Sequence, residues 1–292
     1  MGLMMKNFKM LAIAGAAAAA MTAGTAQAEQ YYGFMTASVN YLDWTEKTID
    51  RTTTVDQGGQ GLGGTKKDFL FLELEGGAGY DWGDVYGFID IENPGNINKS
   101  QNERKEGDKV VEERGVAVPS SFRIAAKGSI AYNIGKTNWN AYGHIYSFTE
   151  ARGDFHGGFF DQNVVLGVSY DINTDSGFWM KPFIGLHYEN QRFAGAGFNG
   201  YMAGWVLGYN FKLGNQNFMV SNWHETEFAR EDQFRSNGTP HKLDKMGQNG
   251  AVALWWNATK KFTAGVQYRY ADQKLGTAAY HDAVIFTAKY NF

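Results

Sequence analysis

The stretch FLFLELEGGAGY, residues 69–80, decides the fold. It is apolar enough for a buried strand, yet it contains Glu73 and Glu75, and a carboxylate removed from water without a partner is costly. Side chains of a β-strand alternate between its two faces, so both glutamates share one face and the leucines share the other. One face of this strand must therefore be wet and the other oily.

The same alternation recurs along the chain in segments of about ten residues. HDAVIFTAKYNF, residues 281–292, places its apolar side chains on one face and His281, Thr287 and Lys289 on the other. KFTAGVQYRY, residues 261–270, alternates in the same way. Repeated ten-residue segments of this kind are typical of a transmembrane β-barrel.

Twelve such segments are predicted, and the connections between them alternate in length. The predicted strands are residues 31–43, 68–80, 85–93, 120–132, 138–149, 162–171, 178–190, 199–211, 217–229, 249–257, 261–271 and 281–292. The short turns are DWGD, NIGKTN, NTDSG, KLGNQ and NATKK, and the six intervening loops are longer. Short turns on one rim and long loops on the other are the outer-membrane arrangement, with both termini on the periplasmic side.

A soluble β-sandwich or lipocalin-like barrel would also alternate, but it would bury its apolar face. Here aromatic side chains at strand ends are expected on the apolar face, as in the girdles of a membrane barrel. These are Tyr80, Tyr132, Tyr170, Trp179, Tyr209, Tyr268 and Tyr290. The leucines of residues 69–80 should then face lipid, and the two glutamates should face the lumen.

The N-terminus resembles a secretory signal peptide. The basic MKNFK is followed by the apolar MLAIAGAAAAAM and by TAGTAQA, which has small residues at Ala26 and Ala28. That pattern predicts cleavage after Ala28. The apolar part is too short for a membrane anchor of about 20 residues. We expect residues 1–28 to be a signal peptide and residues 29–292 to form one all-β, single-chain, antiparallel transmembrane barrel.

Composition agrees with this class of protein. The chain has no cysteine, 37 glycines, only 4 prolines and 15% aromatic residues, which suits many strands joined by tight turns. Without Lys6 and Lys9, 25 basic residues face 30 acidic ones, a net charge of −5. This balance argues against a nucleic-acid partner.

The inward face of the predicted strands carries aromatic rings beside charges. The expected lumen residues are Phe34, Phe71, Glu73, Glu75, Tyr86, Phe88, Asp90, Arg123, Lys127, Lys181, Phe183, His187, Glu189, Trp223, Glu225, Glu227 and Arg269. Flat rings favour stacking on planar solutes, and carboxylates accept hydrogen bonds from sugar hydroxyls. This combination suits a nucleoside. It is equally compatible with rings that merely fill a narrow barrel and charges that pair with one another.

Other functions are weighed on the same residues. A barrel of this fold could pass another small solute, although a pore for acidic sugars would carry more inward arginines. A lipid hydrolase would need a hydroxyl beside a base, and none of the six histidines occurs in an H-x-S stretch. A translocator would need a passenger domain upstream of the barrel. A receptor or structural barrel would act through outer loops such as residues 94–119. We therefore expect no enzyme, no cofactor and no metal.

The hairpin FLELEGGAGYDWGDVYGFIDI, residues 71–91, resembles that of the nucleoside-specific channel family, Tsx, and the related OmpK proteins. FRIAAKGSI resembles the basic fourth strand of that family, and GVSYDINTDSG its sixth strand and turn. The NGY at residues 199–201 and the terminal YNF also match. The chain departs from the family pattern at Gly185, where a basic residue is expected, and in YMAGWVLGY, which lacks inward basic residues.

The resemblance implies a passive outer-membrane channel for nucleosides with a narrow, aromatic-lined slot. It implies pore-lining, solute-binding roles for Phe71, Glu73, Glu75, Tyr86, Phe88, Asp90, Arg123, Lys127 and Phe183. The expected partners are nucleosides, the lipid bilayer of the outer membrane and the barrel-assembly machinery. The resemblance also implies that a phage or colicin could use the outer loops as a receptor.

Overall fold

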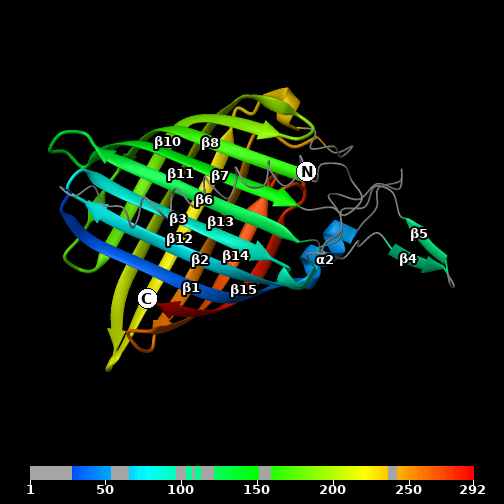
Figure 1. Cartoon of the computed structure of the whole chain (residues 1–292). Coiled ribbons are helices and arrows are strands. Elements are labelled where there is room, and N and C mark those ends of the chain that lie inside the picture. The colour runs from blue at the N-terminus through cyan, green and yellow to red at the C-terminus, as the bar shows by residue number, and fades with distance from the viewer. Residues whose placement is uncertain are drawn as a thin grey trace.

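A computed structural model describes residues 28–53, 66–96, 103–106, 109–112, 122–150, 159–235 and 242–292. Over these ranges the chain forms one closed antiparallel sheet with inclined strands (Figure 1). The predicted signal peptide, apart from Ala28, lies outside the described residues. The fold class expected from the sequence is confirmed.

Twelve long strands form the barrel wall within the described ranges. In chain order they are β1 (Gln30–Trp44), β2 (Phe69–Tyr80), β3 (Gly83–Glu92), β6 (Arg123–Asn133), β7 (Trp139–Glu150), β8 (Phe159–Tyr170), β10 (Phe178–Gln191), β11 (Gly195–Leu213), β12 (Gln216–Phe228), β13 (Gly247–Asn257), β14 (Phe262–Asp272) and β15 (His281–Asn291). Each corresponds to a predicted strand, and no end differs by more than four residues. The two-residue β9 (Ile172–Asn173) pairs only with β10.

Closure joins the first and last strands of the barrel. β1 pairs with β15 on one side and with β2 on the other, and β10 pairs with β11 to complete the ring. Glu29 and Phe292 lie at the rim that carries the short turns, where Asp81 N donates to Glu29 O and Phe292 N donates to Met35 O. Several of these turns use a glycine at positive φ, among them Gly135 (φ 62°) and Gly214 (φ 57°), a conformation that side chains with a Cβ seldom adopt.

The outer surface carries the apolar face of the strands. On β2 the leucines point outward, and Leu72 is 39% exposed. Glu73 and Glu75 point inward, where Ser38 Oγ donates to Glu73 and Tyr86 Oη to Glu75. The alternation in residues 69–80 therefore separates an apolar, lipid-facing surface from a polar lumen, as expected from the sequence.

Exposed aromatic side chains gather near both rims of this outer surface. Near the short turns they include Tyr132, Trp139, Tyr209, Trp256, Tyr290 and Phe292, and near the long loops they include Tyr41, Tyr188, Tyr201 and Tyr268. Two predicted girdle residues differ. Tyr80 is only 6% exposed because its ring stacks on Trp82 at 5.3 Å. Trp179 points into the barrel, because it shares the parity of Lys181 and its ring lies over Gly208.

Smaller elements lie in the long loops, at the rim opposite the short turns (Figure 1). They are α2 (Glu46–Thr53), η1 (Pro94–Asn96), the paired strands β4 (Glu103–Glu106) and β5 (Lys109–Glu112), and η2 (Asp232–Arg235). None of the helices in the described ranges is long and apolar enough to cross a bilayer.

Candidate functional site

The nine predicted solute-binding residues all lie on the inner face of the barrel. Cross-strand pairing sets their levels: Glu73 lies opposite Asp90, Glu75 opposite Phe88, and Phe88 in turn opposite Lys127. Closely spaced charges and rings on β2, β3 and β6 thus share the middle of the lumen. Phe183 lies on β10, further round the ring.

One aromatic wall covers β1 to β3 between mid-height and the short turns. The rings of Phe34 and Tyr86 have centroids 6.5 Å apart, and those of Tyr86 and Phe88 are 6.4 Å apart. Tyr86 Oη donates to Glu75 Oε1 at 2.8 Å, and Lys289 Nζ donates to Glu75 Oε2 at 2.6 Å. Phe34 is 45% exposed inside the barrel, so its ring face is open to a solute. We call these three rings the first wall.

A second aromatic wall lies on β7 and β10. Tyr142 stacks on Phe183 with centroids 4.9 Å apart, and His144 meets Phe183 edge-on at 5.5 Å. The sequence reasoning identified Phe183 but missed the other two. In WNAYGHIYSFTE bulky side chains occur at both parities, so alternation alone left the inward face of this strand uncertain.

Inward rings rest on glycines of the neighbouring strand. A Cβ added at Gly77 would lie 2.9 Å from the Phe34 ring, and a Cβ at Gly204 would lie 2.9 Å from the Phe183 ring. The missing side chain lets each ring lie against the wall, as in the aromatic rescue of glycines in designed sheets. The glycines thus leave the lumen wider than it would be if these rings pointed towards the barrel axis.

An ion pair crosses the lumen between these walls. Lys127 Nζ on β6 donates to Glu225 Oε1 on β12. The ion pair connects β6 to β12 and so divides the ring of strands into two parts. β7, β8, β10 and β11 lie on one side of it, and β13, β14, β15, β1, β2 and β3 lie on the other. The first and second aromatic walls therefore face opposite sides of this pair, which we call the Lys127–Glu225 bar.

Towards the long loops the lumen is filled by protein contacts. Arg123 pairs with Glu92 at 2.5 Å, and its guanidinium lies 4.7 Å from the Phe69 ring centre. Phe71 points inward but is only 6% exposed, because it packs in a cluster with Leu42, Phe69, Ala283 and Ile285. Binding of solute by Phe71 stays a prediction.

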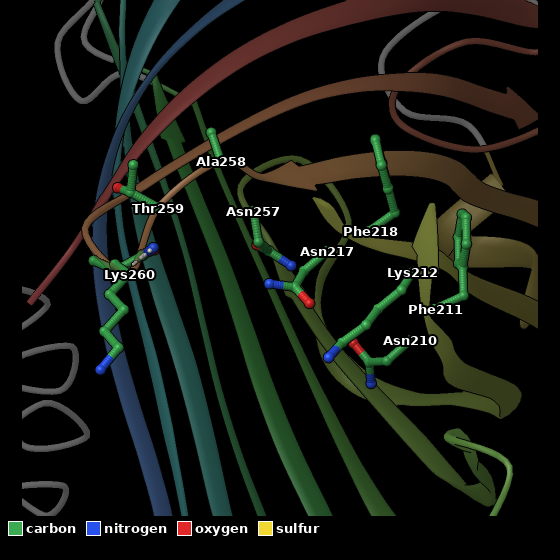
Figure 2. Close-up of a pocket in the computed structure, with 10 residues that line it drawn as sticks. Asn210, Phe211, Lys212, Asn217, Phe218, Asn257, Ala258, Thr259 and Lys260 are labelled. Atoms are coloured by element: carbon green, nitrogen blue, oxygen red, sulfur yellow. Dashed lines mark hydrogen bonds between the residues drawn. The ribbon is translucent and has the colours of Figure 1, made fainter. Parts of the chain in front are cut away.

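Towards the short turns a second ion pair spans the lumen. Lys181 on β10 pairs with Asp84 on β3 and lies 3.0 Å from Asp171. Beyond it, a cavity of about 550 Å³ opens at the mouth between the turns after β11 and β13. Figure 2 shows Asn210, Lys212, Asn217 and Asn257 grouped there. Its lining is rich in amides, so a polar solute would meet hydrogen-bonding groups at this end.

No group of three or more His, Cys, Asp or Glu side chains in the described ranges could hold a metal ion. What the lumen offers is stacking surfaces, carboxylates and ammonium groups on a rigid wall.

A closed antiparallel barrel with an apolar outside, aromatic rims, short turns on one edge and a charged lumen defines an outer-membrane channel. The model of the family described as nucleoside-specific channel-forming protein, Tsx, matches residues 39–292. The chain belongs to this family. It is a passive channel for nucleosides in the bacterial outer membrane.

Solved structures of other outer-membrane proteins resemble the chain more distantly. An outer membrane channel from Pseudomonas putida F1 is 10% identical, with a TM-score of 0.44 over 92% of this chain and 99% of that one. The outer membrane channel DcaP of Acinetobacter baumannii is 14% identical, with a TM-score of 0.34 over 92% and 99%. The toluene transporter TodX of Pseudomonas putida is 10% identical, with a TM-score of 0.35 over 94% and 93%.

Proposed function

We propose that nucleosides pass through this channel by binding at mid-lumen against the first wall, beside Glu75. The observation that carries the proposal is the grouping of the rings of Phe34, Tyr86 and Phe88 beside Glu75. Phe88 lies opposite Glu75 in the sheet, and this carboxylate already accepts hydrogen bonds from Tyr86 and Lys289. A planar base can stack on these rings while the ribose reaches Glu75.

The chemistry needs only weak, reversible contacts. Stacking on an aromatic side chain contributes about 1–3 kcal/mol per base and tolerates different bases. Ribose hydroxyls donate to Glu73 or Glu75, and Lys127 can donate to ring acceptors. Several weak sites in a row allow entry as well as exit, and the second wall with Tyr142 and Phe183 supplies a further stacking surface. No covalent step is involved, so we propose transport without catalysis.

The experiment compares entry of radiolabelled thymidine, adenosine and glucose into liposomes that contain the refolded barrel. We expect both nucleosides to enter faster than the smaller glucose. Phe88→Ala should weaken nucleoside binding about 5- to 150-fold, as the loss of 1–3 kcal/mol implies. Glu75→Gln should slow nucleosides more than glucose. Phe286→Ala, which removes an outward ring, is the matched control.

Two outcomes would overturn the assignment of this site. One is nucleoside entry no faster than glucose entry in the wild type. The other is an equal effect of Phe88→Ala and Phe286→Ala on nucleoside entry. The expected use of outer loops by a phage or colicin, and of the barrel-assembly machinery in folding, stay predictions.

A further inference from the structure

The connection between β14 and β15 places a lysine side chain inside the lumen, although the connection itself lies at the rim of the long loops. Lys274 belongs to this connection, yet it is only 8% exposed. Its Nζ lies 2.9 Å from Glu227 Oε1 and 3.5 Å from Glu225 Oε2, and both glutamates point inward from β12. A lysine on a solvated outer loop would not reach these carboxylates, so this connection folds back into the barrel.

Backbone and side-chain contacts hold the inward fold. Gln273 (φ 53°), Leu275 (φ 58°) and Gly276 (φ 80°) all lie in the left-handed region, which turns the chain sharply on either side of Lys274. Lys274 also forms a β-bridge with Thr277. Left-handed non-glycine residues persist where the surroundings determine the conformation, and they cluster at functional sites.

The neighbouring loop locks Gln273 from outside. Arg230 Nη1 donates to Gln273 O at 2.6 Å, and Asp244 N donates to Gln273 Oε1 at 3.0 Å. Gln273 Nε2 donates to Ala278 O at 2.6 Å within its own connection. Each polar group of this amide thus has a partner, and the position of Lys274 is fixed by two loops together.

Lys274 changes the charge balance at the Lys127–Glu225 bar. Glu225 forms ion pairs with Lys127 on the facing wall and with Lys274 in the loop. Glu227 forms ion pairs with Lys274 and with Arg230, whose Nη2 lies 2.8 Å from Glu227 Oε2. Three cationic groups, Lys127, Lys274 and Arg230, therefore act on these two carboxylates, and the inward acids Asp161 and Glu189 lie within electrostatic range of the same cluster. Loss of Lys274 removes one of the three positive charges that face these acids.

We propose that Lys274 is a specificity-determining residue of the channel, whose positive charge beside the bar disfavours cations and narrows the path. Rings of charged side chains set ion selectivity in pores, and a charge with low-dielectric walls around it acts more strongly than one in bulk water. The inference goes beyond nucleoside binding, because it concerns the passage of ions through the same lumen.

The first test measures reversal potential in a KCl gradient and single-channel conductance in planar bilayers, with no nucleoside present. Lys274→Gln should shift the reversal potential towards that of a cation-selective pore and raise the conductance. Lys274→Arg should retain the wild-type reversal potential. Lys245→Gln, which removes the same charge from an exposed position on the neighbouring loop, is the matched control.

Two further variants keep the test decisive if Lys274→Gln folds poorly. Glu225→Gln removes the shared carboxylate and should shift the reversal potential the opposite way, towards anions. Because the chain has no cysteine, Lys274→Cys supplies a single thiol. A methanethiosulfonate reagent with a positive head should restore the wild-type reversal potential, and one with a negative head should deepen the cation preference.

The proposal is overturned if folded Lys274→Gln and Lys245→Gln give equal reversal potentials. It is also overturned if both reagents, with labelling verified by mass, leave the current through Lys274→Cys unchanged. Either result would reduce Lys274 to a counter-ion that only stabilises Glu227. Because the readout uses salt alone, it is independent of whether nucleosides bind at the first wall.

Discussion

Lys127 on β6 and Glu225 on β12 are 98 residues apart in the chain, yet they form an ion pair across the lumen. The pair separates an aromatic wall on β1 to β3 from a second one on β7 and β10. A solute crossing the barrel therefore meets a divided lumen rather than one wide pore, which suits a channel selective for small planar solutes.

Removing one partner of this bar tests its role in shaping the lumen. Lys127→Met should raise single-channel conductance and reduce the preference for thymidine over glucose, because the lumen is no longer crossed. Breaking a fully buried ion pair costs about 3–5 kcal/mol when a charge is left alone, whereas the side chains of Lys127 and Glu225 are 18% and 14% exposed. Glu225 still has Lys274 at 3.5 Å, so we expect a smaller loss of unfolding free energy.

The measurement is urea unfolding in vesicles together with bilayer conductance. A double-mutant cycle with Glu225→Gln isolates the coupling between the two side chains. If the effects of the two single substitutions add up on both readouts, there is no coupling energy between Lys127 and Glu225, and the bar is contradicted.

The glycine under an inward ring is expected to set the width of the slot. In Gly77→Ala, the new Cβ would lie 2.9 Å from the Phe34 ring and 3.2 Å from Val85 O, so the ring must move off the wall. We expect lower conductance and slower nucleoside entry, with a stability cost of about 1–3 kcal/mol from overpacking.

Gly143→Ala is the control, because Gly143 faces outward beside Leu166. Its Cβ meets a flexible side chain outside the lumen, so conductance should stay at the wild-type value. Equal conductance in both variants would contradict a role for Gly77 in shaping the slot.

A charge on the outer face should destabilise the barrel in the bilayer. Leu72→Lys places an ammonium group on the lipid-facing side of β2, and such substitutions cost about 2–4 kcal/mol near the bilayer midplane. Leu72→Val preserves an apolar side chain and should cost much less. Reversible urea unfolding in lipid vesicles compares the two, and a Lys variant as stable as the Val variant would place Leu72 outside the hydrocarbon region.

Removal of residues 1–28 is expected in the mature protein. Intact mass and N-terminal sequencing of the protein extracted from outer membranes should both place Glu29 first. Ala28→Arg should block this cleavage, because the signal peptidase site requires a small residue there. A mature chain that retains residues before Glu29 would contradict the predicted cleavage position.

Alternation and loop length allowed the sequence to determine the barrel. Leu72 and Glu73 must lie on opposite faces of any strand, whatever its partners, so the oily and wet sides follow from local geometry. Twelve segments with alternately short and long connections then predicted an even, closed sheet with its described ends at one rim. The inward positions of Glu75, Phe88 and Lys127 follow from the same parity.

Contacts between distant strands were decided only by the tertiary structure. Three such contacts depend on how far each strand is shifted against its neighbours and on which strands face each other. They are the ion pair of Lys127 with Glu225, the packing of the Phe34 ring on Gly77, and the inward position of Lys274. Closure of the ring sets those quantities through pairings far apart in the chain. The alternation along a strand determines which face a side chain occupies, but it does not determine the level of that side chain in the barrel or the residue that it contacts. The inward lining was therefore predictable, and the Lys127–Glu225 bar was not.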